Sequence, residues 1–237
     1  MRKMALALAA VVAFPSAAQA EYVNIGIWGN GILGQLALRN AEAASRSSDS
    51  ERRSTPERSR RQDQSGELTF VRSAAVTDQI EEALAPRLAE MVSLPFTMED
   101  PSALVRSAGT RSIYRQELAR RGFSEHSVDG ATALFLAVGW ELANGARLTP
   151  EQNAAIYRHV NRTLPSTPLA RQSDVRRQQE AEMRLIVSAL WLQEASARSR
   201  SPAAMREMSD AVWDDVRLIT GNDMRDFVVT ADGFSRR

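Results

Sequence analysis

The chain has 237 residues, with 30 basic residues against 29 acidic ones and no cysteine. The absence of cysteine excludes disulfides, a thiolate nucleophile and cysteine-based zinc sites. The near-neutral charge gives no general attraction to nucleic acid, so we expect no nucleic-acid partner.

Residues 1–20 carry the three zones of a cleavable secretory signal peptide of bacterial type. A basic pair opens the segment, an apolar run follows over residues 4–14, and small residues end it at Ala18 and Ala20. The apolar run is about half the roughly 20 residues that a membrane-spanning helix needs. We therefore predict cleavage between Ala20 and Glu21 and a periplasmic or secreted mature protein without a transmembrane segment.

Two segments precede the predicted helical domain. Residues 21–40 form an arm that combines Trp28 with aliphatic side chains and glycines, and its Asn30-Gly31 pair is typical of a hairpin turn. Because an isolated hairpin is only marginally stable, the arm either forms one or is a flexible segment that docks on the domain, a second copy or an envelope component. Residues 41–66 contain no large apolar side chain, so we expect a disordered linker there.

Residues 67–237 are predicted to form one all-α domain, a bundle-like arrangement of about six helices. Apolar residues recur at helical spacing, beginning with the stripe of Ile80, Leu84, Leu88 and Met91. We expect the tail after residue 221 to dock as a short helix or strand. After a short helical piece near 103–107, the remaining helices are expected at about 110–121, 128–142, 149–164, 173–197 and 201–219.

Helix-end chemistry supports these limits. Gly122 should end one helix in a Schellman motif that brings Phe123 back to Leu118. Thr149 to Gln152 form a capping box, with a proline at the first helical position. Ser173 should cap the longest helix.

Two of these helices have informative faces. The segment at 128–142 is apolar on both sides, so we expect it at the centre of the domain. On the longest helix, Arg176, Arg177, Gln178 and Glu182 are predicted to face water.

Three motifs resemble an uncharacterised bacterial family of secreted, mostly helical proteins. They are Y-R-x-x-L-x-x-x-G-F at residues 114–123, D-x-A-x-A-L at 129–134 and W-E-x-A-N-G at 140–145. The resemblance covers residues 68–234 at most. The family itself is described only as a domain of unknown function. It implies export and a helical fold, and brings no catalytic residues with it.

The residues offer no familiar catalytic, cofactor or metal site. His126 and His159 lack the spacing that places two metal ligands on one helical face. The chain contains no G-x-S-x-G elbow, and its only lysine, Lys3, belongs to no phosphate-binding loop. We therefore expect no catalytic residues, no bound metal and no cofactor.

One enzymatic hypothesis remains, a cell-wall or glycan-directed hydrolase that uses a carboxylate pair. Its candidate is Glu141, because the neighbouring Trp140 would offer a platform for a sugar. The alternative is that Trp140 lies in the core and Glu141 is solvated or paired with an arginine.

The less apolar face of the central helix gives a second hypothesis. Asp129, Trp140 and Asn144 fall on this face, which could line a groove for a small ligand or peptide. Alternatively, Asp129 caps the helix or pairs with Arg115, Trp140 packs, and Asn144 forms the helix end with Gly145. We favour a non-enzymatic interaction or structural module of the cell envelope, whose partner is an unknown protein or envelope component and whose oligomeric state the sequence leaves open.

Overall fold

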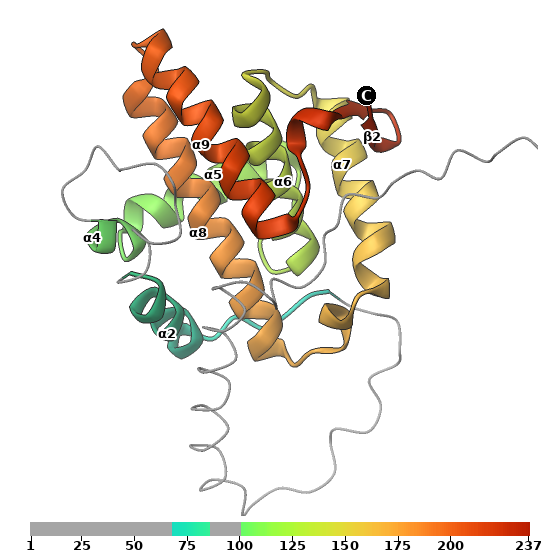
Figure 1. Cartoon of the computed structure of the whole chain (residues 1–237). Helices are drawn as coiled ribbons and strands as arrows, with labels where there is room; N and C mark the ends of the chain where they lie inside the picture. Colours follow the sequence, from blue (N-terminus) through green and yellow to red (C-terminus); the bar gives the residue numbers. More distant parts are fainter. Residues whose placement is uncertain (1–67, 86–100) are drawn as a thin grey trace, which may run out of the picture.

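The computed structural model of the protein describes residues 68–85 and 101–237. Seven α-helices make up most of this part of the chain, which ends in a two-stranded hairpin (Figure 1). The all-α prediction is confirmed. The described residues contain seven helices, against about six predicted, because the short helix α4, of five residues, is counted as a helix of its own. The predicted signal peptide, arm and linker, and with them Trp28, lie outside the described residues, as do Leu88 and Met91. The helices are α2 (Ala74–Leu84), α4 (Pro101–Val105), α5 (Ala108–Arg121), α6 (Val128–Asn144), α7 (Pro150–Thr163), α8 (Asp174–Arg198) and α9 (Pro202–Thr220).

Hydroxyl side chains begin the helices where the sequence predicted them. Thr149 and Gln152 form the reciprocal capping box at the start of α7, with Pro150 in the first turn. At the start of α8, the Ser173 hydroxyl accepts a hydrogen bond from the Arg176 backbone N–H at 3.3 Å. These caps satisfy backbone donors that the helices leave unpaired.

The ends of α5 and α6 also follow the prediction. Gly122 adopts a left-handed φ of 72°, and the Phe123 N–H donates to the Leu118 carbonyl at 2.9 Å. Gly145 ends α6 directly after Asn144 with a φ of 59°. Glycine suits both positions because a side chain makes this backbone conformation unfavourable.

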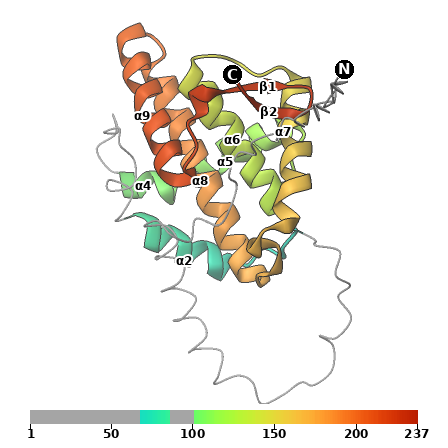
Figure 2. The same cartoon turned by 45° about the vertical axis from the view of Figure 1, so that its right-hand side comes forward.

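Helix α6 runs through the middle of the bundle, as its two apolar faces predicted. Every residue from Val128 to Glu141 is buried, and the helix packs against α5, α7, α8 and α9 (Figures 1 and 2). Helices α6 and α9 approach closely at Gly139, where a Cβ atom would lie 2.8 Å from Cγ2 of Val216. The absence of a side chain at Gly139 therefore permits this packing.

The first described residues join the bundle through a short antiparallel bridge between Thr69 and Ser127. The Val128 N–H donates to the Leu68 carbonyl at 2.8 Å, and the Phe70 N–H donates to the His126 carbonyl at 3.1 Å. Helix α2 follows and packs against α8 (Figure 1). The bridge places Leu68 and Thr69 beside the start of α6.

The C-terminal tail forms a short 3-10 turn, η5 (Met224–Asp226), and an antiparallel hairpin of β1 (Phe227–Thr230) and β2 (Gly233–Arg236). Phe227 lies opposite Arg236 in this hairpin. Both strands contact α7 (Figure 2), and the Gln152 side-chain amide donates to the Val229 carbonyl at 2.9 Å. We predicted that the tail docks as a short helix or strand, and it docks as a 3-10 turn followed by two strands.

His159 should make the stability of the protein sensitive to acid. Its imidazole is buried under the hairpin, with its ring edge-on to Phe234 at 6.1 Å between ring centroids. Burial lowers the pKa of His159 below the ordinary 6.5, and the charge of Arg162 lowers this pKa further. Between the two values only the unfolded chain binds the proton, so the free energy of unfolding falls as the pH drops through this window.

We expect His159→Gln to lose this part of the acid sensitivity. Urea denaturation at about pH 7.5 and about pH 5, on either side of the ordinary histidine pKa, would measure it. His126→Gln, at an exposed histidine, is the matched control and should keep the wild-type pH dependence. Equal acid sensitivity in all three proteins would contradict the assignment to His159.

Helix α8 buries polar side chains that the sequence placed in water. Gln178 is 1 % exposed and Glu182 is 3 % exposed, so the prediction that they face solvent is wrong. Arg176 and Arg177 are also largely covered. Arg72, from the segment before α2, lies with its Nε 3.0 Å from the Glu182 carboxylate. Burial raises the pKa of Glu182, and the charge of Arg72 opposes this rise.

Candidate functional site

Four of the candidate residues lie on α6, at its two opposite ends. Trp140, Glu141 and Asn144 are in the last turns, whereas Asp129 is in the first turn. With a rise of about 1.5 Å per residue, Asp129 and Trp140 are about 16 Å apart along the helix axis. One small ligand does not reach both ends, so we describe the two ends separately.

The C-terminal tail covers Trp140 and Asn144. The Trp140 indole N–H donates to the Phe227 carbonyl at 2.9 Å. The Asn144 side-chain amide donates to the carbonyls of Trp140 and Met224, and its oxygen accepts from Arg237 at 3.0 Å. These bonds fasten the tail to α6 and leave the two side chains engaged within the protein.

Glu141 belongs to a buried ion pair. Its Oε2 lies 2.7 Å from the guanidinium of Arg121, whose side chain is 0 % exposed. Its Oε1 accepts the Leu148 N–H at 2.9 Å, and the Asn153 side-chain oxygen accepts from Arg121 at 2.7 Å. The carboxylate therefore connects α5, α6 and the loop before α7.

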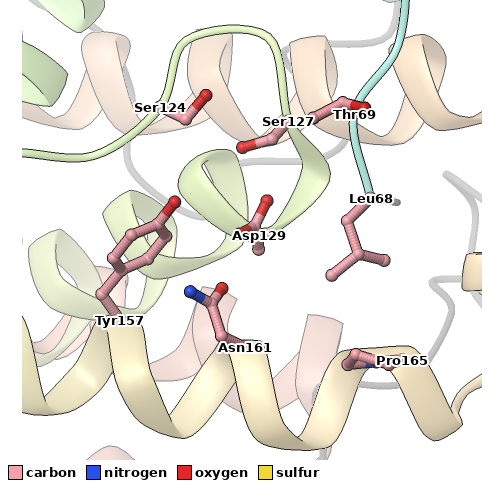
Figure 3. Close-up of a pocket in the computed structure, with 8 residues that line it drawn as sticks. All are labelled: Leu68, Thr69, Ser124, Ser127, Asp129, Tyr157, Asn161 and Pro165. Atoms are coloured by element: carbon pink, nitrogen blue, oxygen red, sulfur yellow. The ribbon is translucent and has the colours of Figure 1, made fainter. Parts of the chain in front are cut away.

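Asp129 lies beside a pocket of about 250 Å³ at the start of α6 (Figure 3). It is 9 % exposed, and its Oδ1 has no hydrogen-bond partner among the residues that the structure describes. The two structural roles expected for Asp129 are filled by other residues. The Ser127 hydroxyl caps α6 by accepting the Gly130 N–H at 3.2 Å, and Arg115 pairs with Glu125.

Three parts of the chain build this pocket, which we call the Asp129 pocket. In Figure 3 the side chains of Tyr157 and Asn161 reach from α7 toward Asp129, and Leu68 lies on the other side of the carboxylate. Asn161 is exposed, so the pocket opens to solvent. The lining consists of Leu68, Thr69, Ser124, Ser127, Asp129, Tyr157, Asn161 and Pro165.

The pocket has a single charge surrounded by neutral hydrogen-bonding groups. Asp129 is the only charged residue among the eight that line it. Burial raises the pKa of the Tyr157 hydroxyl, and the negative charge of Asp129 raises it further, so this phenol is a neutral donor at physiological pH. Its ring packs against Phe123, with 5.2 Å between ring centroids.

Gly130 shapes the wall of the pocket. A Cβ atom at this position would lie 2.0 Å from the Ser124 carbonyl oxygen. A side chain there would push the loop that carries Ser124 and Ser127 away from α6. The bridge between Thr69 and Ser127 holds the same loop from the other side.

Sequence reasoning singled out Asp129 but none of its neighbours in the pocket. Tyr157 and Asn161 lie four residues apart and therefore share one face of α7. That spacing was visible in the sequence, but nothing local linked this face to the loop before α6 or to Leu68. The pocket arises from tertiary contacts between segments that are distant in sequence.

Within residues 68–85 and 101–237 the structure offers neither a metal centre nor a membrane-spanning helix. In this part of the chain, no group of three histidine, aspartate or glutamate side chains could hold a metal ion. Among the same residues, no helix is both long and apolar enough to cross a membrane. The Asp129 pocket is therefore the candidate site that we consider further.

A family model described as a family of unknown function (DUF6683) matches residues 2–211. The chain belongs to this family. The DUF6683 match includes every residue that lines the Asp129 pocket and ends within α9, before the tail that covers Trp140. No curated protein and no solved structure matches the chain. The resemblance to an uncharacterised family is thereby confirmed, and the family description names no activity.

Proposed function

We propose that this protein is an exported, non-enzymatic binding module of the cell envelope, and that it binds a small polar ligand in the Asp129 pocket. The observation that carries the proposal is the Asp129 Oδ1, which is buried beside an open pocket without a hydrogen-bond partner in the described part of the chain. A buried acceptor left unsatisfied costs about 1–3 kcal/mol. A ligand that donates to this oxygen would recover that cost on binding.

The arrangement of carboxylates favours binding over glycan hydrolysis. Hydrolysis of a glycosidic bond normally uses two carboxyl groups about 5–9.5 Å apart on either side of the bond. Among the residues that line the pocket, Asp129 alone carries a carboxylate. Glu141, the candidate for the hydrolase hypothesis, is held by Arg121. One carboxylate among hydroxyls can hold a polar ligand but offers no acid–base pair.

Asp129→Asn should separate binding from stability. Asparagine keeps the shape of the side chain, removes the buried charge and loses a favourable interaction with the positive end of α6. These effects oppose each other, so we expect the free energy of unfolding to change by less than about 1 kcal/mol. Urea denaturation would measure stability, and ligand-detected NMR with a library of small polar compounds would measure binding.

We expect the wild-type protein to bind compounds from the library at this pocket and Asp129→Asn to lose them. A structural role for Asp129 would instead appear as a stability loss well above about 1 kcal/mol with unchanged binding. Asp78→Asn, at an exposed aspartate on α2, makes the same change in charge away from the pocket and should leave both measurements unchanged.

Export is supported by the order of basic, apolar and small residues within residues 1–20. We expect the protein recovered from the periplasm or the medium to begin at Glu21. Intact-mass spectrometry of that material would test this directly. A protein that retains Met1, or one found only in the cytoplasm, would refute the proposed location. The binding proposal would not be affected by that result, because the Asp129→Asn experiment tests it separately.

A further inference from the structure

The charge of the Asp129 pocket selects against anions. Asp129 is its only charged lining residue, so a ligand carboxylate or phosphate would meet a like charge in a partly desolvated place. The choice lies between a neutral ligand and a cation. A cation gains Coulomb attraction that a neutral donor lacks, and burial strengthens this attraction relative to bulk water.

The start of α6 offsets only part of the negative charge. A helix N-terminus acts as about half a positive elementary charge. The Ser127 hydroxyl takes the Gly130 N–H, and Arg115 is engaged by Glu125. The Tyr157 hydroxyl also interacts with the Asp129 carboxylate, but it is a neutral group and does not cancel the charge. The Asp129 Oδ1 itself has no hydrogen-bond partner among the described residues.

The neighbouring groups match the donors of an ammonium ion. An alkylammonium carries three N–H donors and no acceptor. Asp129 supplies an unused carboxylate oxygen, and Ser124 and Asn161 each carry a side-chain oxygen that can accept. In Figure 3 the Asn161 side-chain oxygen lies on the side that faces Asp129, whereas the Ser124 hydroxyl does not point toward the carboxylate. Asp129 on α6 and Asn161 on α7 can therefore offer acceptor oxygens to one nitrogen from two sides of the pocket.

The pocket has room for more than the nitrogen. A volume of about 250 Å³ accommodates an ammonium group together with the carbon atoms next to it. Leu68 and Pro165 add an apolar side that suits the carbon atoms next to the nitrogen. We infer that the Asp129 pocket binds a primary ammonium group, carried on a small molecule or on the end of a larger one. This inference rests on the proposed binding function and adds the chemical class of the ligand.

A charge series of similar shape tests the inference. Ethanolamine, ethylene glycol and glycolate share a two-carbon frame and are cationic, neutral and anionic at neutral pH. Each would be titrated into the ¹⁵N-labelled full chain while the backbone amides of Leu68, Ser127 and Asn161 are followed. We expect ethanolamine to saturate these shifts at a concentration at least about tenfold lower than ethylene glycol, and glycolate to leave them unchanged.

Variants assign the preference to the carboxylate. Asp129→Asn should weaken ethanolamine binding at least about tenfold, to the level of ethylene glycol, because the charge is gone and the shape is retained. Asp78→Asn should bind ethanolamine as the wild type does. If Asp129→Asn retained the wild-type preference for ethanolamine, the placement of the ammonium group at Asp129 would be wrong.

The two proposals fail in different ways. Equal binding of ethanolamine and ethylene glycol at the pocket, or tighter binding of glycolate, would overturn the ammonium inference and leave a binding site for another ligand class. Absence of shifts at the pocket amides with all three probes, together with no binder from the wider compound library, would overturn the proposed binding function itself.

Discussion

Val212→Asp should unfold the helical domain. Val212 is 1 % exposed and lies one turn before Val216, the residue that α9 places against Gly139 of α6. A carboxylate in this position would be buried in an apolar contact. An uncompensated buried charge costs about 3–5 kcal/mol, a large part of the roughly 5–15 kcal/mol that stabilises a typical domain. We expect the variant to lose the cooperative thermal unfolding transition. Circular dichroism at 222 nm, the usual signal for helical proteins, would monitor this transition.

The same helix provides the control. Leu218 is 74 % exposed on α9, so Leu218→Asp adds the same charge in contact with water. We expect the melting temperature of Leu218→Asp to stay near that of the wild type. A Val212→Asp variant with a wild-type transition would mean that α9 does not pack on α6 as described, and the central position of α6 would then be in doubt.

The parts of the fold that the sequence predicted are those fixed by local signals. Apolar residues on both faces placed α6 at the centre, because a helix with two apolar faces must be covered on both sides. Thr149 and Gln152 bond to each other within one turn, so the start of α7 needed no tertiary information. Gly122 marked the end of α5 for a similar reason.

The prediction for α8 failed where local polarity was overridden by tertiary contacts. Gln178 and Glu182 look like a solvated stripe in the sequence. In the structure the Gln178 side-chain oxygen accepts the Ser73 N–H at 2.9 Å, and Glu182 accepts from the hydroxyl of Thr77 at 2.8 Å. These partners are about a hundred residues away in the chain, and no periodicity within α8 reports them.

The Asp129 pocket was hidden for the same reason. The sequence indicated a polar residue at the start of α6, but a pocket requires knowledge of what lies opposite. Tyr157 comes from α7, and Leu68 arrives through the bridge between Thr69 and Ser127. The composition of α6 also does not reveal that its two ends differ. The C-terminal tail covers Trp140 at one end, whereas a pocket lies beside Asp129 at the other.

The buried pair of Arg121 and Glu141 should show that α5 and α6 depend on each other. Glu141→Leu would leave the Arg121 guanidinium fully buried with only Glu117 and Asn153 as partners, and the Leu148 N–H would lose its acceptor. Breaking one side of a buried ion pair costs about 3–5 kcal/mol. We expect Glu141→Leu and Arg121→Met each to lose stability in that range, measured by urea denaturation near neutral pH.

The double variant Arg121→Met with Glu141→Leu should lose much less than the sum of the two single losses. With both charges gone, no uncompensated ion remains, and the two apolar side chains can pack in the vacated space. An exposed pair gives the comparison: Asp214→Asn, which breaks the surface contact with Arg217, should change stability by less than about 1 kcal/mol. Additive losses in the double variant, or single losses as small as that of Asp214→Asn, would mean that Arg121 and Glu141 do not form the buried contact on which the packing of α5 against α6 depends.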